Sequence, residues 1–259
     1  MSDSALPILE IKHVNKTFAL NGQSIEALRN ASLTVRKGEF ICLIGASGCG
    51  KSTLLRLVAG FEAPTSGEVL MWGTPVAGPD PTRGMVFQDY GLFPWLTVRD
   101  NIGFGPKSRG LASKVVKETA EKFIELVGLQ RFADAYPHQL SGGMKQRVAI
   151  ARVLANDAEM VLMDEPFGAL DAMTRERLQD ELVEIWSRTK LTVLFVTHSI
   201  EEAIFLADRV VVMSPGPGRI DNEYLIDLQR PRAIASSEFN AWRGILSSKL
   251  HSHHGRKVA

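Results

Sequence analysis

Hydrophobic and polar residues alternate along the first part of the chain and later give way to almost wholly apolar runs. Residues 8–14 and 27–35 alternate, as half-exposed strands do, and Asn21-Gly22 marks a turn between them. Three later runs are apolar, at residues 40–44, 160–163 and 192–196. Continuous apolar strands are typical of the buried, parallel centre of a sheet. The pattern therefore predicts an α/β fold with a mixed sheet and an N-terminal antiparallel β subdomain.

Apolar residues at helical spacing predict the helices that connect these strands. The predicted helices begin near Lys51, at about Ser113, after Ser141 and after Asp171. Short strands are expected at residues 68–72 and 84–87.

The hydrophobic pattern of the chain changes after Gln88. Residues 89–110 are expected to be irregular, and residues 89–156 to form an inserted helical subdomain. The core is then built from residues 8–88 and 157–230, which makes 8–230 a single domain. Residues 231–259 form a C-terminal extension. Its histidine-rich end is more typical of a disordered terminus than of a metal site.

A glycine-rich loop of the pattern G-x-x-x-x-G-K-S lies between the first apolar run and the first helix. Its residues are Gly45, Ala46, Ser47, Gly48, Cys49, Gly50, Lys51, Ser52 and Thr53. Glycines let successive N–H groups turn into one cavity, and the helix start adds its positive dipole end. Lys51 supplies a charge for the β- and γ-phosphates, and the Ser52 hydroxyl can ligate Mg²⁺. The loop predicts a P-loop NTPase core that binds a nucleoside triphosphate.

Polar side chains follow the other two apolar runs where each ends. Asp164 and Glu165 follow residues 160–163, and His198 follows residues 192–196. Open parallel sheets bind ligands at the carboxyl ends of their strands, so these groups are expected to face the glycine loop. Asp164 is suited to hold Mg²⁺ through water, and Glu165 to polarise an attacking water. His198 is expected to reach the γ-phosphate, although a structural role is the alternative.

Three further features allow two interpretations each. Ser141-Gly142-Gly143 opens either an ordinary capped helix or an anion site, and the residues alone do not decide between them. Phe18 is either core, which the residues alone favour, or an aromatic that stacks on adenine. Cys49 is either a reactive thiol beside Lys51 or, as we favour, a tolerated small residue. Cys42 and Cys49 are the two cysteines, and both are expected to be reduced in a cytosolic protein.

The overall composition adds few constraints. The 259 residues are 45% hydrophobic and 23% charged, and the net charge of +1 gives no indication of a nucleic-acid partner. No apolar stretch reaches the roughly 18 residues that span a bilayer. The N-terminus lacks the basic and apolar segments of a signal peptide.

The order of these elements along the chain closely resembles the ATP-binding subunits of ABC transporters, from about Ile8 to Leu228. The residues that carry the resemblance are Gln88, Leu140-Ser141-Gly142-Gly143, Asp164-Glu165, Asp171 and His198. The Leu-Ser-Gly-Gly element separates this family from other P-loop proteins. A finer resemblance, in residues 88–98, 166–171 and 214–220, is to the nitrate, aliphatic sulfonate and taurine uptake group of bacterial importers. Met144 and Ser199 depart from the wider family, which usually has glutamine and aspartate there.

The resemblance implies a role for each site residue. Phe18 stacks on adenine, Gln88 contacts Mg²⁺ and the attacking water, Glu165 is the catalytic base, and His198 steadies the γ-phosphate. Ser141, Gly142 and Gly143 cap the γ-phosphate bound by a second copy of the chain, and Asp171 lies at the dimer seam.

The resemblance also implies a function. A homodimer hydrolyses ATP with Mg²⁺ and drives solute uptake through separate membrane-spanning permease subunits, which work with a substrate-binding protein. The protein is then peripheral on the cytoplasmic face of the bacterial inner membrane and has no nucleic-acid partner. The alternatives are a soluble ABC-type ATPase and a P-loop kinase. A soluble ABC-type ATPase usually carries another ATPase unit, coiled coils or zinc motifs. A P-loop kinase does not explain Ser141-Gly142-Gly143. The solute is selected by other polypeptides.

Overall fold

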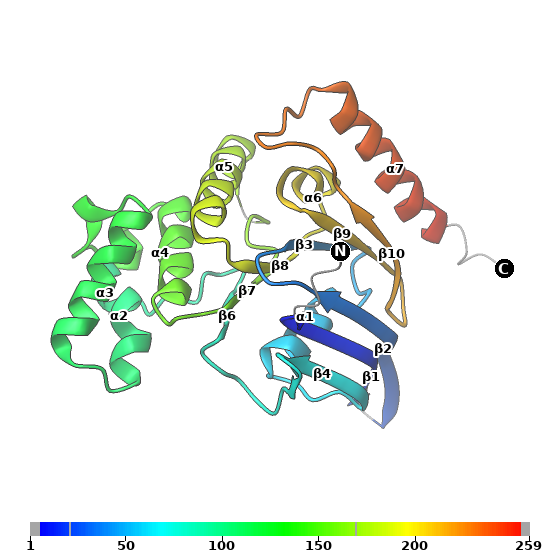
Figure 1. Cartoon of the computed structure of the whole chain (residues 1–259), viewed down its shortest axis with the longest axis horizontal. Helices are drawn as coiled ribbons and strands as arrows, with labels where there is room; N and C mark the ends of the chain where they lie inside the picture. Colours follow the sequence, from blue (N-terminus) through cyan, green and yellow to red (C-terminus); the bar gives the residue numbers. More distant parts are fainter. Residues whose placement is uncertain (1–5, 21, 169, 255–259) are drawn as a thin grey trace. The chain divides into compact units, whose positions relative to one another are not determined.

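The computed structural model describes residues 6–20, 22–168 and 170–254, with side chains as far as residue 250. The chain forms two compact units, which Figure 1 colours by position along the sequence. The first unit contains Met1–Pro79 and Leu191–Ala259, and the second contains Asp80–Lys190. The expected helical subdomain, residues 89–156, lies within the second unit. Among its described residues, that unit also contains two strands and one further helix.

An antiparallel sheet forms the N-terminal part of the first unit, as the alternating pattern predicted. Its strands are β1 (Leu9–Leu20), β2 (Gln23–Val35), β4 (Ser66–Met71) and β5 (Thr74–Pro75), in the order β2-β1-β4-β5 (Figure 1). Leu9 pairs with Val35 at one end of the hairpin, and Leu20 pairs with Gln23 at the other. Gly22 has a φ of 78°, a conformation that glycine adopts without strain. The two hairpin strands therefore extend beyond the alternating segments, residues 8–14 and 27–35, that predicted them.

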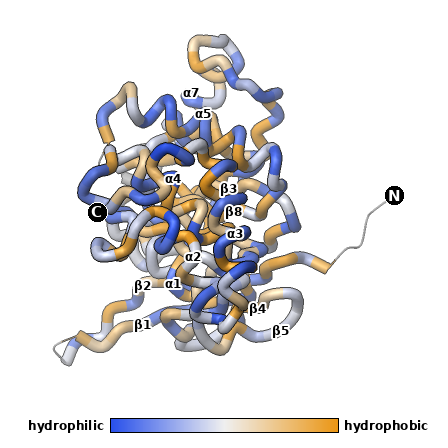
Figure 2. The backbone as a smooth tube through the Cα atoms, turned by 90° about the vertical axis from the view of Figure 1, so that its left-hand side faces the viewer, coloured by the Kyte–Doolittle hydropathy of each residue, from blue (hydrophilic) through white to orange (hydrophobic). Residues whose placement is uncertain are grey.

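The apolar strands of the first unit lie side by side and are buried. The central strand β3 (Phe40–Gly45) is flanked by β8 (Thr192–Val196) and β9 (Arg209–Ser214), both parallel to it. The edge strand β10 (Arg219–Leu225) is antiparallel to β9. Every residue of β3 and β8 is buried, and Figure 2 shows hydrophobic segments gathered at these two strands. The predicted mixed sheet is confirmed.

Three helices complete the described part of the first unit. They are α1 (Lys51–Ala59), α6 (Ile200–Leu206) and α7 (Ser237–His254). Helix α7 is anchored by the buried side chains of Phe239 and Leu246, and the Trp242 indole donates to Asp227 at 3.3 Å. The C-terminal extension is therefore more regular than expected, since the helix continues through the histidine-rich segment. The disordered end that we predicted included residues 251–254, and this part of the prediction was wrong because they belong to α7. The rest of the predicted disordered end, residues 255–259, lies outside the described residues.

The second unit combines a pair of parallel strands with helices. Strand β6 (Arg83–Val86) pairs with β7 (Met160–Asp164), and Val86 lies opposite Met163. The helices are α2 (Val98–Ser108), α3 (Ser113–Leu126), α4 (Gly142–Leu154) and α5 (Ala172–Thr189), with two short 3₁₀ turns, η1 (Gln130–Phe132) and η2 (Pro137–Gln139).

The expectation of an irregular segment at residues 89–110 was wrong for its second half, which is α2. Thr97 caps this helix, because its hydroxyl accepts a bond from the Asp100 N–H at 3.1 Å. The glycines that obscured the helical pattern allow close packing. A Cβ on Gly103 would lie 3.1 Å from Val116 of α3, and one on Gly105 would lie 2.7 Å from Asn156.

In the part of the chain that the structure describes, no helix combines the length and the apolar character that a membrane span needs.

Candidate functional site

The glycine loop follows β3 and leads directly into α1. Gly48 and Gly50 have φ values of 77° and 92°, which a residue with a side chain adopts only with strain. Gly50 is the N-cap residue of α1, so the helix begins on bare backbone. The helix start therefore offers N–H groups and a positive dipole end to an anion.

Lys51 lies over this loop and is only 5% exposed. Its Nζ donates to the carbonyl oxygens of Gly45 at 2.8 Å and Ala46 at 3.2 Å. Because a buried ammonium is costly unless it is hydrogen-bonded, these carbonyls fix the charge at the mouth of the loop. The Lys51 ammonium is therefore held at the loop by backbone carbonyls, and its role in binding phosphate stays a prediction.

Cys49 is buried within the loop, and its accessibility bears on the two interpretations of this residue. Burial raises the pKa of the Cys49 thiol, and the nearby Lys51 ammonium only partly offsets this. Burial also raises the pKa of Cys42, and both cysteines are free. The structure therefore favours Cys49 as a tolerated small residue over a reactive thiol.

His198 stands at the same edge of the sheet as the loop. Strands β3 and β8 are parallel, and the N–H of Thr197 donates to the carbonyl of Leu43 at 3.1 Å. The Thr197 hydroxyl donates to Glu202 at 2.5 Å and accepts from the Ser199 N–H at 3.0 Å. These bonds fix the backbone on both sides of His198, whose side chain is exposed.

Phe18 is half-buried on β1, which is intermediate between the two interpretations of this residue. The Lys16 ammonium lies 4.7 Å from the centre of its ring. Lys16 pairs with Leu28 of β2, and Leu28 packs on Gly50 of the loop. Phe18 is therefore on the strand segment next to the loop, and a role in stacking on adenine stays a prediction.

In the second unit, Gln88 and Glu165 follow neighbouring strand ends. Gln88 comes two residues after β6, and Asp164 is the last residue of β7. A Cβ on Gly168 would lie 3.2 Å from Nε2 of Gln88, and the Gly168 N–H donates to the carbonyl of Glu165 at 3.1 Å. Glu165 has a φ of 46°, an uncommon conformation for a residue with a side chain. Strained backbone of this kind concentrates at functional sites.

The oxygen donors expected at a magnesium site are a carboxylate, a hydroxyl and an amide. Asp164 is half-buried at the end of an otherwise buried strand, where a carboxylate is costly unless it has a partner. Hard oxygen ligands of this kind suit Mg²⁺, which also keeps waters and takes phosphate oxygens. Asp164 and Gln88 in the second unit, and Ser52 in the first, each supply an oxygen donor of the kind that Mg²⁺ binds.

Ser141 is the N-cap of α4, and its hydroxyl accepts from the Met144 N–H at 3.3 Å. The next two residues are glycines, because neighbouring side chains fill the space beside the start of α4. A Cβ on Gly142 would lie 3.1 Å from Leu170 and 3.4 Å from the Tyr90 hydroxyl, and one on Gly143 would lie 3.3 Å from Leu178. Ser141 itself is exposed, so the N-terminal end of α4 is open to a ligand.

Asp171 caps the next helix, α5, by accepting from the Thr174 N–H at 3.0 Å. This hydrogen bond lowers the pKa of the Asp171 carboxyl. The carboxylate is exposed and follows Leu170, which packs on Gly142. Asp171 and the start of α4 are therefore neighbours on one surface of the second unit.

The structure thus divides the predicted site between the two units. The first unit holds Phe18, the loop from Gly45 to Thr53 and His198, and the second holds Gln88, Ser141–Gly143, Asp164, Glu165 and Asp171. Sequence reasoning missed two residues that contact this set or the segment beside it. Arg152 binds the segment after Gln88, and Gly218 packs on the loop at Cys49. Gly218 lies within residues 214–220, a segment that the sequence analysis had used only for the finer family resemblance.

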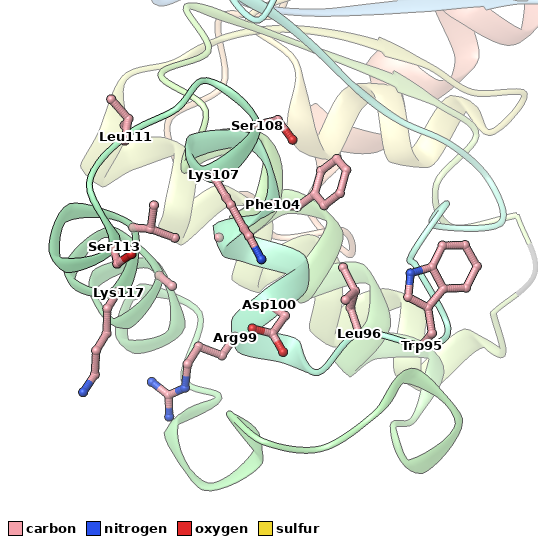
Figure 3. A pocket seen from close by; sticks show the side chains of 13 residues that line it. Trp95, Leu96, Arg99, Asp100, Phe104, Lys107, Ser108, Leu111, Ser113 and Lys117 are labelled. Atoms are coloured by element: carbon pink, nitrogen blue, oxygen red, sulfur yellow. The ribbon is translucent and has the colours of Figure 1, made fainter.

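A groove of about 780 Å³ opens between α2 and α3 and continues to the segment before α2 (Figure 3). Trp95 and Phe104 supply exposed apolar surface, with 69% and 41% of their area exposed. Arg99, Lys107 and Lys117 contribute positive charge to its lining. An exposed apolar groove with a charged rim is typical of a protein-binding surface.

Known proteins share this sequence over most of its length. The model of the ABC transporter family matches residues 28–168. An ABC transporter ATP-binding protein of Methanocaldococcus jannaschii is 54% identical over 91% of this chain and 88% of its own. The nitrate import ATP-binding protein NrtD of Synechocystis is 52% identical over 85% and 83%. The taurine import ATP-binding protein TauB of Roseobacter denitrificans is 49% identical over 83% and 81%.

Solved structures agree with this relationship. The dimeric, post-hydrolysis ATP-binding cassette MJ0796, bound to ADP and Pi, superposes with a TM-score of 0.72 at 32% identity. The match covers 85% of this chain and all of that one. The structure of cbiO1 from Clostridium perfringens has a TM-score of 0.78 at 25% identity, over 95% and 93%. By sequence and by fold, this chain belongs to the ABC transporter family, as one of its ATP-hydrolysing subunits.

Proposed function

We propose that the chain is the ATPase subunit of a bacterial importer and that two copies close head to tail around two ATP molecules. The observation that carries the dimer is the exposed start of α4, with Ser141 and Gly142 at its tip. It offers the same chemistry as the glycine loop, a helix N-terminus aimed at an anion. The dimeric cassette MJ0796 bound to ADP and Pi supports the arrangement.

Each residue of the site has a task in this proposal, and Gln88 has two. The loop N–H groups and Lys51 hold the phosphate chain, and Phe18 packs on the adenine ring. Glu165 accepts a proton from the attacking water, while Gln88 orients that water and His198 donates to the γ-phosphate. When bound, Mg²⁺ neutralises charge on the β- and γ-phosphates, with Ser52, Gln88 and Asp164 as its ligands. Catalysis then rests on positioning and charge stabilisation.

The closed dimer is favoured by the contacts that ATP makes with both copies. Ser141, Gly142 and Gly143 of one chain contact the γ-phosphate held by the glycine loop of the other, with Asp171 at the seam. These contacts exist only when the dimer is closed, so ATP shifts the equilibrium toward closure. Hydrolysis removes the group that both chains hold, and the dimer opens.

The groove between α2 and α3 is the proposed docking surface for a membrane-spanning permease subunit. It starts at Trp95, seven residues beyond Gln88, so a partner in the groove is connected along the chain to the catalytic segment. The importer would then work with a substrate-binding protein, with this chain peripheral on the cytoplasmic face of the inner membrane. The solute class we propose is a nitrate, sulfonate or taurine-type anion. NrtD and TauB, named for nitrate and taurine import, support it.

Membrane fractionation of cells that contain the transporter tests this function. We expect the wild-type chain in the membrane fraction, and a Trp95→Ala variant largely in the soluble fraction. Leu225→Ala is the matched control, because Leu225 is 70% exposed but lies on β10, outside the groove. A chain that is wholly soluble and co-purifies with ribosomes would instead support a soluble ABC-type ATPase.

A further inference from the structure

The turn between β9 and β10 has no task in the proposed function. It contains Pro215-Gly216-Pro217-Gly218, and its two glycines differ sharply in their surroundings. Gly216 is exposed, and a Cβ built on it would meet no atom within 4 Å among the described residues. Gly218 is buried. The turn therefore has a solvent side and a packed side.

The packed side of the turn is hydrogen-bonded to β2 through the backbone. The Gly218 N–H donates to the carbonyl of Ala27 at 3.0 Å, and the Arg29 N–H donates to the carbonyl of Gly218 at 2.9 Å. Leu28 and Gly218 form a parallel bridge. These two hydrogen bonds fix the position of Gly218 relative to β2, and so relative to the antiparallel sheet.

Gly218 also packs directly on the phosphate loop. A Cβ at this position would lie 1.9 Å from the carbonyl oxygen of Cys49, far inside van der Waals contact. The same peptide group carries the N–H of Gly50, at the start of α1. The other end of the loop has a similar contact, because a Cβ on Gly45 would lie 2.7 Å from the carbonyl oxygen of Met213 in β9. The β9–β10 hairpin thus contacts both ends of the loop.

The loop is supported from β2 as well. A Cβ on Gly50 would lie 2.7 Å from Cδ2 of Leu28 and 2.9 Å from the carbonyl of Ala27. Leu28 is fully buried, and Ala27 is the residue that accepts the bond from Gly218. The loop, β2 and the turn therefore meet at one point, with backbone packed on backbone.

We propose that Gly218 is a positioning residue for ATP binding and that its close contact with the Cys49 carbonyl sets the direction of the Cys49–Gly50 peptide. A side chain at residue 218 must displace either the loop or the two hydrogen bonds to β2. Both β9 and β2 are held by their sheets, so the loop yields. Its N–H groups then turn away from the phosphates, and hydrogen bonds weaken steeply with misalignment. This inference rests on the proposed role of the loop as the phosphate site.

The test compares Gly218→Ala with Gly216→Ala, a matched substitution whose Cβ meets no atom within 4 Å among the described residues. Binding is measured with a fluorescent ATP analogue in EDTA, and again by competition with tripolyphosphate, which lacks the adenosine. We expect Gly218→Ala to weaken both affinities about tenfold or more, and Gly216→Ala to leave both unchanged. Circular dichroism and thermal melting establish that the variants are folded. Normal tripolyphosphate affinity in a folded Gly218→Ala protein would overturn the inference.

If Gly218→Ala does not fold, hydrogen exchange in the wild-type protein decides. ATP should slow exchange of the Gly218 and Arg29 amides, whose hydrogen bonds join the turn to β2 beside the loop, but not of the amides near Glu223 in the second half of β10. Unchanged exchange at Gly218 and Arg29 would count against the inference. A wild-type chain that binds no tripolyphosphate would count against the proposed function instead.

Discussion

Arg152 and Gly91 are joined by a hydrogen bond of 2.6 Å, from Nη1 of the arginine to the carbonyl oxygen of the glycine. The second guanidinium nitrogen donates to the carbonyl of Tyr90 at 3.2 Å, and the guanidinium lies 5.5 Å from the centre of the Phe93 ring. Arg152 belongs to α4, the helix that begins at Ser141. One side chain thus connects the segment after Gln88 to the helix that we assign to the second ATP.

Replacing Arg152 with methionine should release this segment. Methionine retains apolar bulk but none of the hydrogen bonds, each of which contributes on the order of 1.5–3 kcal/mol when one partner is charged. Because Gln88 is then less firmly placed, we expect kcat for ATP hydrolysis to fall roughly tenfold or more, with a smaller change in KM. Steady-state ATPase assays measure both. Arg188→Met is the control, since Arg188 is 60% exposed on α5. A normal kcat for Arg152→Met would contradict the link.

Replacing Lys51 with alanine should abolish tight nucleotide binding. A charge-assisted bond to phosphate of about 3 kcal/mol corresponds to roughly a hundredfold in affinity. Isothermal titration with ATP measures the loss, and Lys12→Ala is the control because Lys12 is 47% exposed and paired with Glu10 on β1. Equal affinity in Lys51→Ala and the wild type would contradict the assignment of the loop as the phosphate site.

Replacing Glu165 with glutamine should separate binding from hydrolysis. The two side chains have nearly the same shape, so ATP affinity should be retained, while loss of a general base lowers the rate by about 10²–10⁴-fold. The variant should then accumulate as an ATP-bound dimer, which light scattering after size-exclusion chromatography detects. Glu118→Gln, at a 62% exposed site on α3, should remain monomeric under the same conditions. Unchanged turnover in Glu165→Gln would remove this residue from the role of base.

These predictions rest on local sequence patterns and on contacts between residues far apart in the chain. Only the local patterns were available from the sequence. The apolar strands and the glycine loop were predicted correctly because each is encoded by a few adjacent residues. Gln88 and Glu165 were placed at strand ends by the same local signals. Helix α2 was missed because Gly103 and Gly105 resemble loop residues until the neighbouring elements that they contact are known.

Arg152 and Gly218 could not have been assigned a role from local patterns. Arg152 binds a carbonyl 61 residues away in the chain, and nothing in the apolar spacing of α4 marks it for this contact. Gly218 looks like a turn glycine, as Gly216 does, and only the proximity of Cys49 separates the two. Long-range backbone contacts of this kind leave no periodic trace in the sequence.

The two cysteines should resist alkylation in the folded protein. Both side chains are fully buried, and burial raises the pKa of each thiol, so little thiolate is present at pH 7.5. Mass spectrometry after brief iodoacetamide treatment should show an unmodified native chain, and two modifications in guanidinium chloride. Rapid native modification of Cys49 would instead support the reactive-thiol interpretation.

The N-cap carboxylate of Asp171 should make stability depend on pH in a defined direction. The bond from the Thr174 N–H lowers the pKa of Asp171 in the folded state, so the folded protein binds this proton less readily than the unfolded chain. Its contribution is therefore complete above the unfolded pKa of about 3.9 and is lost as the pH falls through the lower folded value. Asp171→Asn keeps an acceptor oxygen but cannot carry the charge.

Urea unfolding at several pH values measures this contribution. The difference in midpoint between the wild type and Asp171→Asn should be largest near pH 7. It should shrink as the pH falls below about 4, where the unfolded chain gains the proton first, and should be lost below the lower folded pKa, where the folded protein gains the proton too. Ser141→Ala removes an uncharged cap of α4, so its midpoint difference from the wild type should not follow the same curve. A difference for Asp171→Asn that is constant from pH 7 to pH 3 would show that the side chain stabilises α5 by its shape alone and not by its charge.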